Sequence, residues 1–235
     1  MMRRMLPTAG HALVTGAARR IGRSLALDLA AQGWNVAIHY RHSEAEAREV
    51  LAGVEQAGAH GAIVQADLAR EDETSTLVER ASAALGAPLT LLVNNASVFE
   101  RDSLSTSTRA SWDLHLETNL RAPAVLTQGF AAKLPEGVEG LVVHLVDHLA
   151  ETPVVDFFSY GLSKAALWSL TRMQAVALAP RIRVNAIGPG LTLPSRFQTP
   201  ESFDRAWHST PLGRGTSPDE IAAALRFLLD RKSVV

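Results

Sequence analysis

The chain has 235 residues, of which 47% are hydrophobic, and its formal net charge is −1. This length suits one large domain or two small ones with a sizeable core, and the near-neutral charge excludes general attraction to nucleic acid or to an anionic membrane surface. The absence of cysteine excludes disulfides, thiolate metal sites and cysteine nucleophiles. With no signal peptide at the start and no run of about 20 apolar residues, we expect a cytoplasmic protein that does not bind membranes.

Short apolar runs alternate along the chain with longer amphipathic segments. The apolar runs predict six β-strands, at residues 12–15, 35–40, 61–65, 90–94, 140–146 and 183–187. Helical spacing separates them, as where Ile21, Leu25 and Leu29 recur every four residues. This order predicts a single α/β domain over residues 1–235, with a Rossmann-like, doubly wound parallel sheet flanked by helices.

Three segments depart from the alternation. Residues 1–10 are expected to form an N-terminal extension, and residues 191–213, which contain three prolines, a flap over a substrate site. Residues 219–229 predict a helix with Ser217 as its N-cap and Pro218 at its first position. A doubly wound sheet usually gains another strand after such a helix, so we expect the last strand to be missing.

The turn after the first predicted strand is a candidate dinucleotide site. Residues 15–22 read TGAARRIG, and Gly16 and Gly22 allow a tight turn in which backbone N–H groups and the helix N-terminus bind a pyrophosphate. Arg20 replaces the middle glycine of the usual fingerprint. The alternative is a strand-to-helix turn that binds no ligand.

The end of the second predicted strand bears on which dinucleotide binds. NAD sites tend to carry an acidic residue here that holds the ribose 2′-hydroxyl, but no acidic residue precedes Glu44. Arg41, His42 and Ser43 offer cationic and hydroxyl groups for a 2′-phosphate, so the sequence predicts NADPH. A solvated basic turn is the alternative.

Polar residues also follow the third and fourth predicted strands. Asp67 is placed either to meet the adenine amino group or to cap the next helix. Asn94 and Asn95 end the fourth strand at the edge where open α/β sheets bind ligands, although a turn would also explain them.

The predicted catalytic group is a phenol, an ammonium and a carboxylate. If residues 160–164 are helical, Tyr160 and Lys164 share one face, and the ammonium favours the phenolate form of a group whose ordinary pKa is about 10. Such a phenol is a usable proton donor near neutral pH. Asp147 ends the fifth strand and either faces this pair or turns away from it.

In this order and spacing, the chain from about residue 11 to residue 229 resembles the short-chain dehydrogenase/reductase family. The resemblance rests on the segments and residues 15–22, Asp67, 94–96, Asn119, Tyr160, Lys164 and 183–190. It implies that Tyr160 donates a proton and that Lys164 binds the nicotinamide ribose and polarises Tyr160. It also implies that Asn119 holds a water of the proton relay, and that the protein is a homo-oligomer, a dimer or tetramer, an inference the missing strand weakens.

Within that family the sequence is similar to pteridine reductases and to bacterial dihydromonapterin and dihydrofolate reductases. Arg20, the turn at 39–43, Phe99 and an Asp147 in place of the catalytic serine carry this similarity. It implies a pterin or folate substrate contacted by Arg20, Ser97, Phe99, Asp147 and Tyr160. The implied NADPH contacts are Gly16, Arg20, Ile21, Gly22, Tyr40, Arg41, His42, Ser43, Asp67, Leu68, Asn95, Ala96, Tyr160, Lys164, Pro189, Gly190 and Thr192.

The carboxylate of Asp147 decides which bond the site can reduce. A ketone that accepts hydride develops negative charge on oxygen, and an ionised Asp147 accepts hydrogen bonds without donating any. Like charges about 4 Å apart cost roughly 4 kcal/mol at an effective dielectric of 20, which amounts to about three decades of rate. A C=N bond instead needs a proton on nitrogen, so we predict NADPH-dependent reduction of a dihydropterin.

Two other functions stay open. A carbonyl reductase of the same family, acting on a ketoacyl group or a sugar, would share the fold and cofactor. A non-catalytic NADPH-binding sensor would share the cofactor but would not need a proton relay. Independently of these functions, ordinary core packing is the alternative for Phe99. No metal is expected because no acidic set accompanies His144 and His148.

Overall fold

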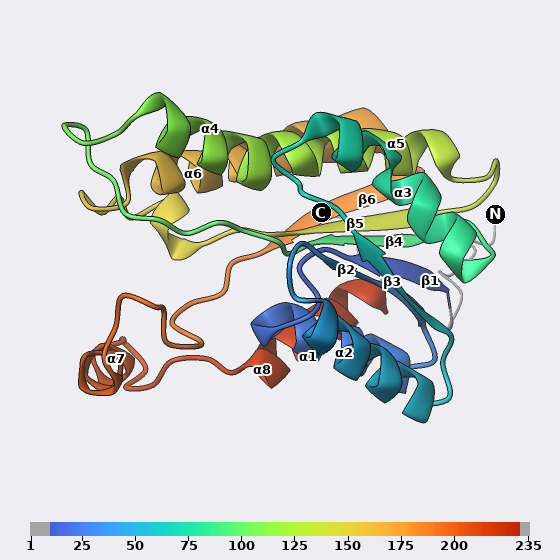
Figure 1. Ribbon diagram of the computed structural model, residues 1–235, viewed down its shortest axis with the longest axis horizontal. Coiled ribbons are helices and arrows are strands. Elements are labelled where there is room, and N and C mark those ends of the chain that lie inside the picture. Colours follow the sequence, from blue (N-terminus) through green and yellow to red (C-terminus); the bar gives the residue numbers. More distant parts are fainter. Residues whose placement is uncertain (1–9, 231–235) are drawn as a thin grey trace.

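The computed structural model describes residues 10–230, and its centre is a six-stranded, fully parallel sheet. The strand order is β3-β2-β1-β4-β5-β6 (Figure 1). The strands are β1 (His11–Val14), β2 (Asn35–Tyr40), β3 (Gly61–Gln65), β4 (Leu91–Asn94), β5 (Gly140–Leu145) and β6 (Ile182–Ile187). All six predicted strands are confirmed, with ends that differ by a residue at most.

Helices cover both faces of the sheet (Figure 1). One face carries α1 (Arg20–Ala31), α2 (Glu44–Gln56) and α8 (Pro218–Leu229). The other carries α3 (Glu71–Leu85), α4 (Arg109–Leu116), α5 (Ala122–Lys133) and α6 (Phe158–Leu178). Because side chains alternate along a strand, Ala12 and Val14 join the first core cluster and Leu13 joins the second. The predicted doubly wound α/β fold is therefore confirmed.

The strand order fixes where a ligand can enter. The chain builds β1, β2 and β3 outward in one direction and then returns to place β4 on the other side of β1. At such a switch point the loops after the two central strands separate and leave a crevice at the carboxyl edge. Here the loops after β1 and β4 border it, and the Asn95 side chain donates to the carbonyl of Thr15 across it, at 2.8 Å.

The long segment after β6 leaves the layers of the fold. It contains α7 (Pro200–His208), which lies apart from the sheet in Figure 1. Residues 191–213 were predicted to form a flap, and within them Pro200 occupies the first turn of α7, where its missing N–H costs nothing, while Thr199 caps the helix. The same logic holds at α8, where the predicted N-cap Ser217 forms a reciprocal capping box with Glu220.

Two predictions concern residues outside the described range. Apart from Gly10, the N-terminal extension lies there, as do residues 231–235, where a further strand would follow α8. Within residues 10–230, none of the helices combines the length and apolar character needed to cross a membrane.

Candidate active site

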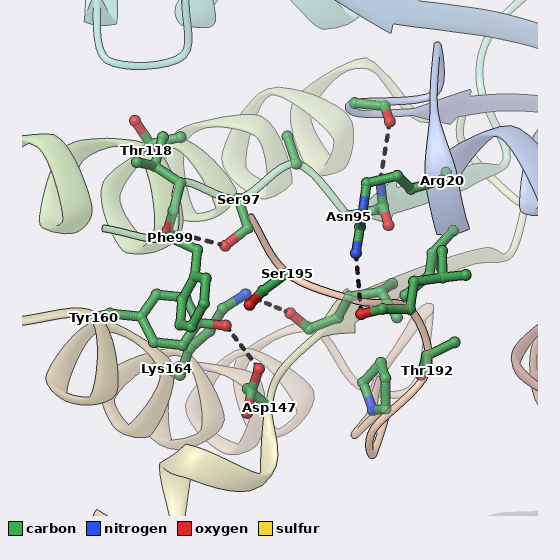
Figure 2. Close-up of a pocket in the computed structure, with 18 of the residues that line it drawn as sticks. Arg20, Asn95, Ser97, Phe99, Thr118, Asp147, Tyr160, Lys164, Thr192 and Ser195 are labelled. Atoms are coloured by element: carbon green, nitrogen blue, oxygen red, sulfur yellow. Dashed lines mark hydrogen bonds between the residues drawn. The ribbon is translucent and has the colours of Figure 1, made fainter. Parts of the chain in front are cut away.

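A pocket of about 810 Å³ occupies the crevice at the carboxyl edge of the sheet. It is bordered by the loops after β1, β4, β5 and β6, and by the first turns of α6 (Figure 2). The predicted site residues that line it are Gly16, Arg20, Ile21, Gly22, Arg41, Asp67, Leu68, Asn95, Ala96, Ser97, Phe99, Asp147, Tyr160, Lys164, Pro189, Gly190 and Thr192. Tyr40, His42, Ser43 and Asn119 do not line it.

The glycine turn is held by a buried histidine that the sequence analysis gave no role. The Gly16 N–H donates to Nδ1 of His39 at 3.0 Å, so Nε2 carries the proton and donates to the carbonyl of Ala66 at 3.1 Å. Burial lowers the pKa of His39 to about 4 and keeps the ring neutral. Gly16 has φ 62°, and a Cβ on Gly22 would lie 2.3 Å from the Gly16 carbonyl oxygen, so both positions need glycine.

Arg20 contacts the flap. Its backbone has a positive φ of 54°, which is unusual for a residue with a side chain. Its guanidinium donates to the carbonyl of Pro194 at 2.9 Å and to that of Leu193 at 3.3 Å (Figure 2). The predicted contacts of Arg20 with cofactor phosphates and substrate stay predictions, and the contact with the flap is one that the sequence did not indicate.

The end of β2 presents one cation to the pocket. Arg41 lines it, and its Nη1 lies 3.8 Å from Oδ1 of Asp67. Asp67 also accepts from the Ala69 N–H at 3.1 Å, so it both borders the pocket and stabilises its own turn. Arg19 was not among the predicted site residues, although it lines the pocket and forms an ion pair with Glu46.

Tyr160 and Asp147 meet at the centre of the pocket (Figure 2). The Tyr160 hydroxyl donates to Oδ2 of Asp147 at 2.7 Å. The other carboxylate oxygen accepts from the Leu149 N–H and from Nδ1 of His148, each at 2.9 Å. The alternative in which Asp147 turns away from Tyr160 is therefore wrong.

The protonation states of this pair follow from its contacts. Burial opposes ionisation of Asp147, but the hydrogen bonds from His148, Leu149 and Tyr160 outweigh it and lower its pKa. Burial and the Asp147 charge raise the pKa of Tyr160 above its ordinary value. The structure thus holds an ionised carboxylate beside a neutral phenol.

Lys164 does not lower the pKa of Tyr160 as the sequence analysis predicted. The two residues do share one face of α6, but Nζ of Lys164 donates to the Leu145 carbonyl at 2.9 Å and lies 5.8 Å from the centre of the Tyr160 ring. Burial and the charge of Asp147, which contacts the phenol directly, raise the pKa of Tyr160 instead. Burial lowers the pKa of Lys164 itself to about 8, although Asp147 opposes that shift.

Asn119 lies behind the pocket wall, in the single π-helical turn Glu117–Arg121. Its oxygen accepts from the Val98 N–H at 2.8 Å and from Ser97 Oγ at 3.2 Å. Its nitrogen donates to the Val98 carbonyl at 2.9 Å and to Ser163 Oγ at 3.0 Å. Asn119 therefore fastens the loop that carries Ser97 to α6, and its role in a water relay stays a prediction.

Aromatic rings form the wall beside Tyr160. Phe99 stacks on Phe157 with 4.3 Å between ring centres, and it meets the Tyr160 ring edge-on at 4.6 Å. Phe197, from the flap, lies 5.8 Å from Phe99. Phe99 is thus a pocket residue rather than part of either core cluster, whereas Trp207 packs on Phe203 and does not line the pocket.

The two histidines near Asp147 have different surroundings. His144 is buried, accepts from Asn94 and donates to Gln174 at 2.9 Å, and its pKa falls to about 4. His148 borders the pocket, and the hydrogen bond to Asp147 raises its pKa. Between residues 10 and 230, no three His, Asp or Glu side chains lie together in a way that could hold a metal ion.

Comparison with known proteins agrees with this geometry. A sequence profile of the short-chain dehydrogenase/reductase type, described as enoyl-(acyl carrier protein) reductase, matches residues 16–235. Pteridine reductase 1 of Leishmania tarentolae is 33% identical, over 97% of this chain and 92% of that protein. The 3-oxoacyl-(acyl-carrier-protein) reductase FabG of Staphylococcus epidermidis is 30% identical, over 94% of this chain and 92% of that protein.

Solved structures give the same fold. FolM alternative dihydrofolate reductase 1 of Brucella canis, crystallised with NADP, is 42% identical. The two structures have a TM-score of 0.93, and the match covers 100% of this chain and 92% of the other.

The chain therefore belongs to the short-chain dehydrogenase/reductase family of oxidoreductases. The predicted similarity to pteridine reductases is confirmed as well. Because a 3-oxoacyl reductase also matches, family membership alone does not choose between a C=N and a C=O substrate.

Proposed function

We propose that this protein is an NADPH-dependent reductase of a C=N bond in a dihydropterin, such as dihydrobiopterin, dihydromonapterin or dihydrofolate. The observation that carries the proposal is the 2.7 Å hydrogen bond from Tyr160 to Asp147. It brings a proton donor and an ionised carboxylate to one point of the pocket, where the common pattern of the family has a serine hydroxyl.

The pocket has the features that NADPH requires. Gly16, Gly22 and the N-terminus of α1 form a cradle for a pyrophosphate, and a Cβ on Gly16 would lie 3.0 Å from the backbone of Ala96. Arg41 supplies a cation for the 2′-phosphate, and Lys164 would hold the nicotinamide ribose. The NADP in the similar Brucella canis structure supports the same choice.

Each residue of the site has its own role in the proposed reaction. When bound, NADPH would supply the hydride that reduces the carbon of the C=N bond, which leaves the electron pair of that bond on nitrogen. Tyr160 gives its proton to this nitrogen, and the Lys164 ammonium, 5.8 Å from the centre of the Tyr160 ring, is the nearby positive charge when the phenol has lost its proton. Asp147 accepts the hydrogen bond that holds the hydroxyl before transfer, while His148 provides a nearby site from which the pair can be reprotonated. For a substrate that arrives as a protonated iminium, Asp147 attracts the positive charge and Tyr160 keeps its proton.

A carbonyl substrate fits these contacts less well. An oxyanion beside Asp147 would face an acceptor-only group, because hydrogen bonds hold the pKa of that carboxylate low. Because FabG is also similar to this chain, the assay must include ketone substrates. NADPH oxidation should be measured with the three dihydropterins and with a panel of ketoacyl and sugar substrates, and turnover of ketones alone would contradict the proposal.

A sensor that binds NADPH without chemistry is tested by Tyr160→Phe. This change removes one hydroxyl and leaves the ring contact with Phe99 in place. The proposal expects turnover to fall at least about 100-fold while NADPH still binds. Tight binding together with unmeasurable turnover in the unmodified protein would favour the sensor.

A further inference from the structure

The rim of the pocket carries a cation on an aromatic surface. The guanidinium carbon of Arg101 lies 4.9 Å from the ring centre of Phe197 and 5.8 Å from that of Phe157. Arg101 lines the pocket and is exposed to solvent. A guanidinium held on ring faces keeps its N–H donors free at its edge, where they can bind an anion.

The backbone fixes Arg101 from both sides. The preceding residue, Glu100, donates its N–H to Nε2 of buried His115 at 3.1 Å. The following residue, Asp102, is buried and donates its N–H to the Asp156 carbonyl at 3.1 Å, while its carboxylate accepts from the Ser159 N–H at 2.9 Å. Arg101 therefore projects from an anchored strand-like segment rather than from a free loop.

Two other arginines, Arg19 and Arg196, pair with carboxylates, whereas Arg101 does not. Arg19 pairs with Glu46, and Arg196, whose guanidinium also lies over Phe197, pairs with Glu100. Within the described part of the chain, Arg101 has no carboxylate within 4.0 Å. A cation that lies at the mouth of a binding pocket and has no carboxylate partner is suited to bind a ligand that carries a negative charge.

The position of Arg101 defines which part of a substrate it can reach. A continuous series of ring contacts leads from Tyr160 to Phe99, from Phe99 to Phe157, and from there to Arg101, with no centre-to-centre step above 5.8 Å. A pterin reduced next to Tyr160 would direct its 6-substituent along this aromatic wall. Arg101 is thus at the distal end of that substituent, away from the reacting bond.

We propose that Arg101 binds a carboxylate at the distal end of the 6-substituent of the substrate, and that Phe157 and Phe197 pack against an aromatic linker between this carboxylate and the pterin. The inference rests on the proposed function and narrows it to folate-type dihydropterins. A short neutral polyol at the same position would leave the guanidinium fork unused, whereas a carboxylate would form a paired, charge-assisted contact.

The test compares Arg101→Gln with Arg196→Gln. Both changes remove one cation from the face of Phe197 and keep a side chain of similar length, but only Arg101 lines the pocket. Steady-state kinetics should be measured for each with dihydrofolate, which carries an aromatic linker and carboxylates, and with dihydrobiopterin, which has a neutral side chain. Binding of 4-aminobenzoyl-glutamate, the tail alone, is measured by calorimetry on the NADP complex.

We expect Arg101→Gln to raise the KM for dihydrofolate about 5- to 10-fold relative to that for dihydrobiopterin, and to weaken binding of the tail fragment by a similar factor. We expect Arg196→Gln to leave the ratio of the two KM values within about twofold. An equal rise in both KM values for Arg101→Gln, or the same ratio change for Arg196→Gln, would overturn the subsite and leave the proposed function standing. If the unmodified protein reduces no dihydropterin, the proposed function fails first and this inference with it.

Discussion

The phenol of Tyr160 and the carboxylate of Asp147 share one hydrogen bond of 2.7 Å, so the two groups hold a single dissociable proton between them. That proton resides on the phenol, because the pKa of Asp147 is lowered and that of Tyr160 is raised. An acceptor that takes the proton leaves two adjacent anions, which the Lys164 ammonium must offset. The reactivity of the site therefore depends on the pair and its counter-charge together.

The first prediction concerns Asp147. Asp147→Ser and Asp147→Asn should each lower kcat/KM for a dihydropterin by about 100-fold or more, because both remove the carboxylate that orients Tyr160. Asp147→Ser should also gain weak turnover of ketones, since a hydroxyl can donate to an oxyanion. Asp156→Asn, which neutralises an exposed carboxylate upstream of α6, is the control. Unchanged pterin kinetics in the Asp147 variants would refute the role given to that residue.

The second prediction separates two neighbouring residues of the turn after β2. Arg41→Ala should raise the KM for NADPH about tenfold and change that for NADH little, because Arg41 lines the pocket and a 2′-phosphate is absent from NADH. His42→Ala should have a much smaller effect, because its side chain does not line the pocket. Initial rates with both cofactors measure this, and equal losses with NADPH and NADH in Arg41→Ala would remove the phosphate assignment.

The third prediction uses the pKa of Lys164, which burial lowers to about 8. The ammonium is present below this pH and is lost as the pH rises through it, so kcat/KM should decline above about pH 8. Tyr160 cannot cause this decline, because its own pKa is raised well beyond that range. In Lys164→Arg the guanidinium stays charged, so the alkaline decline should disappear from the pH profile even though the rate is lower throughout. A profile that keeps its decline would place the titration elsewhere.

The fourth prediction concerns acid stability. His39 has a pKa of about 4 in the folded protein and about 6.5 in the unfolded chain, so between these values only the unfolded chain binds the proton. Lowering the pH through this window therefore favours unfolding, by up to about 3 kcal/mol for this residue. Buried His144 adds a contribution of the same sign.

Thermal unfolding between pH 7 and pH 4 measures this effect. The Tm should fall as the pH falls, and His39→Asn, which keeps an acceptor for the Gly16 N–H, should make this fall less steep. His144→Gln is the matched variant and should reduce the slope by a similar amount. A slope that neither variant changes would show that other groups control the acid transition.

Sequence patterns predicted the sheet and the principal site because both depend on local periodicity. The strands are short apolar runs that the chain buries on both faces, and residues 160–164 place Tyr160 and Lys164 on one helical face whatever surrounds them. The carboxyl edge of the sheet collects the loops after β1, β4 and β5, so topology placed Asp147 near Tyr160, although whether it faced the phenol was left open.

The hydrogen-bond partners of individual side chains could not be predicted from the sequence in the same way. The expectation that Lys164 lowers the pKa of Tyr160 failed because burial and the adjacent Asp147 carboxylate raise that pKa, while the Leu145 carbonyl holds the ammonium. The side-chain amide of Asn119 bonds to Ser97, Val98 and Ser163, contacts that the sequence did not indicate, and its role in a water relay stays a prediction. The hydrogen-bond partner that a side chain takes depends on differences of a few tenths of an ångström in three-dimensional distance. The spacing of residues along the sequence does not give these distances.

Arg20 joins the phosphate turn to the flap across 174 positions of sequence. Its guanidinium donates to the carbonyls of Pro194 and Leu193, which uses two of its five N–H donors and leaves the others for a ligand. If Arg20 also binds a cofactor phosphate, as the sequence predicts, one side chain would contact the dinucleotide and the flap together. Filling the dinucleotide site first would then position the flap for the second ligand, which favours an ordered kinetic sequence with the cofactor leading.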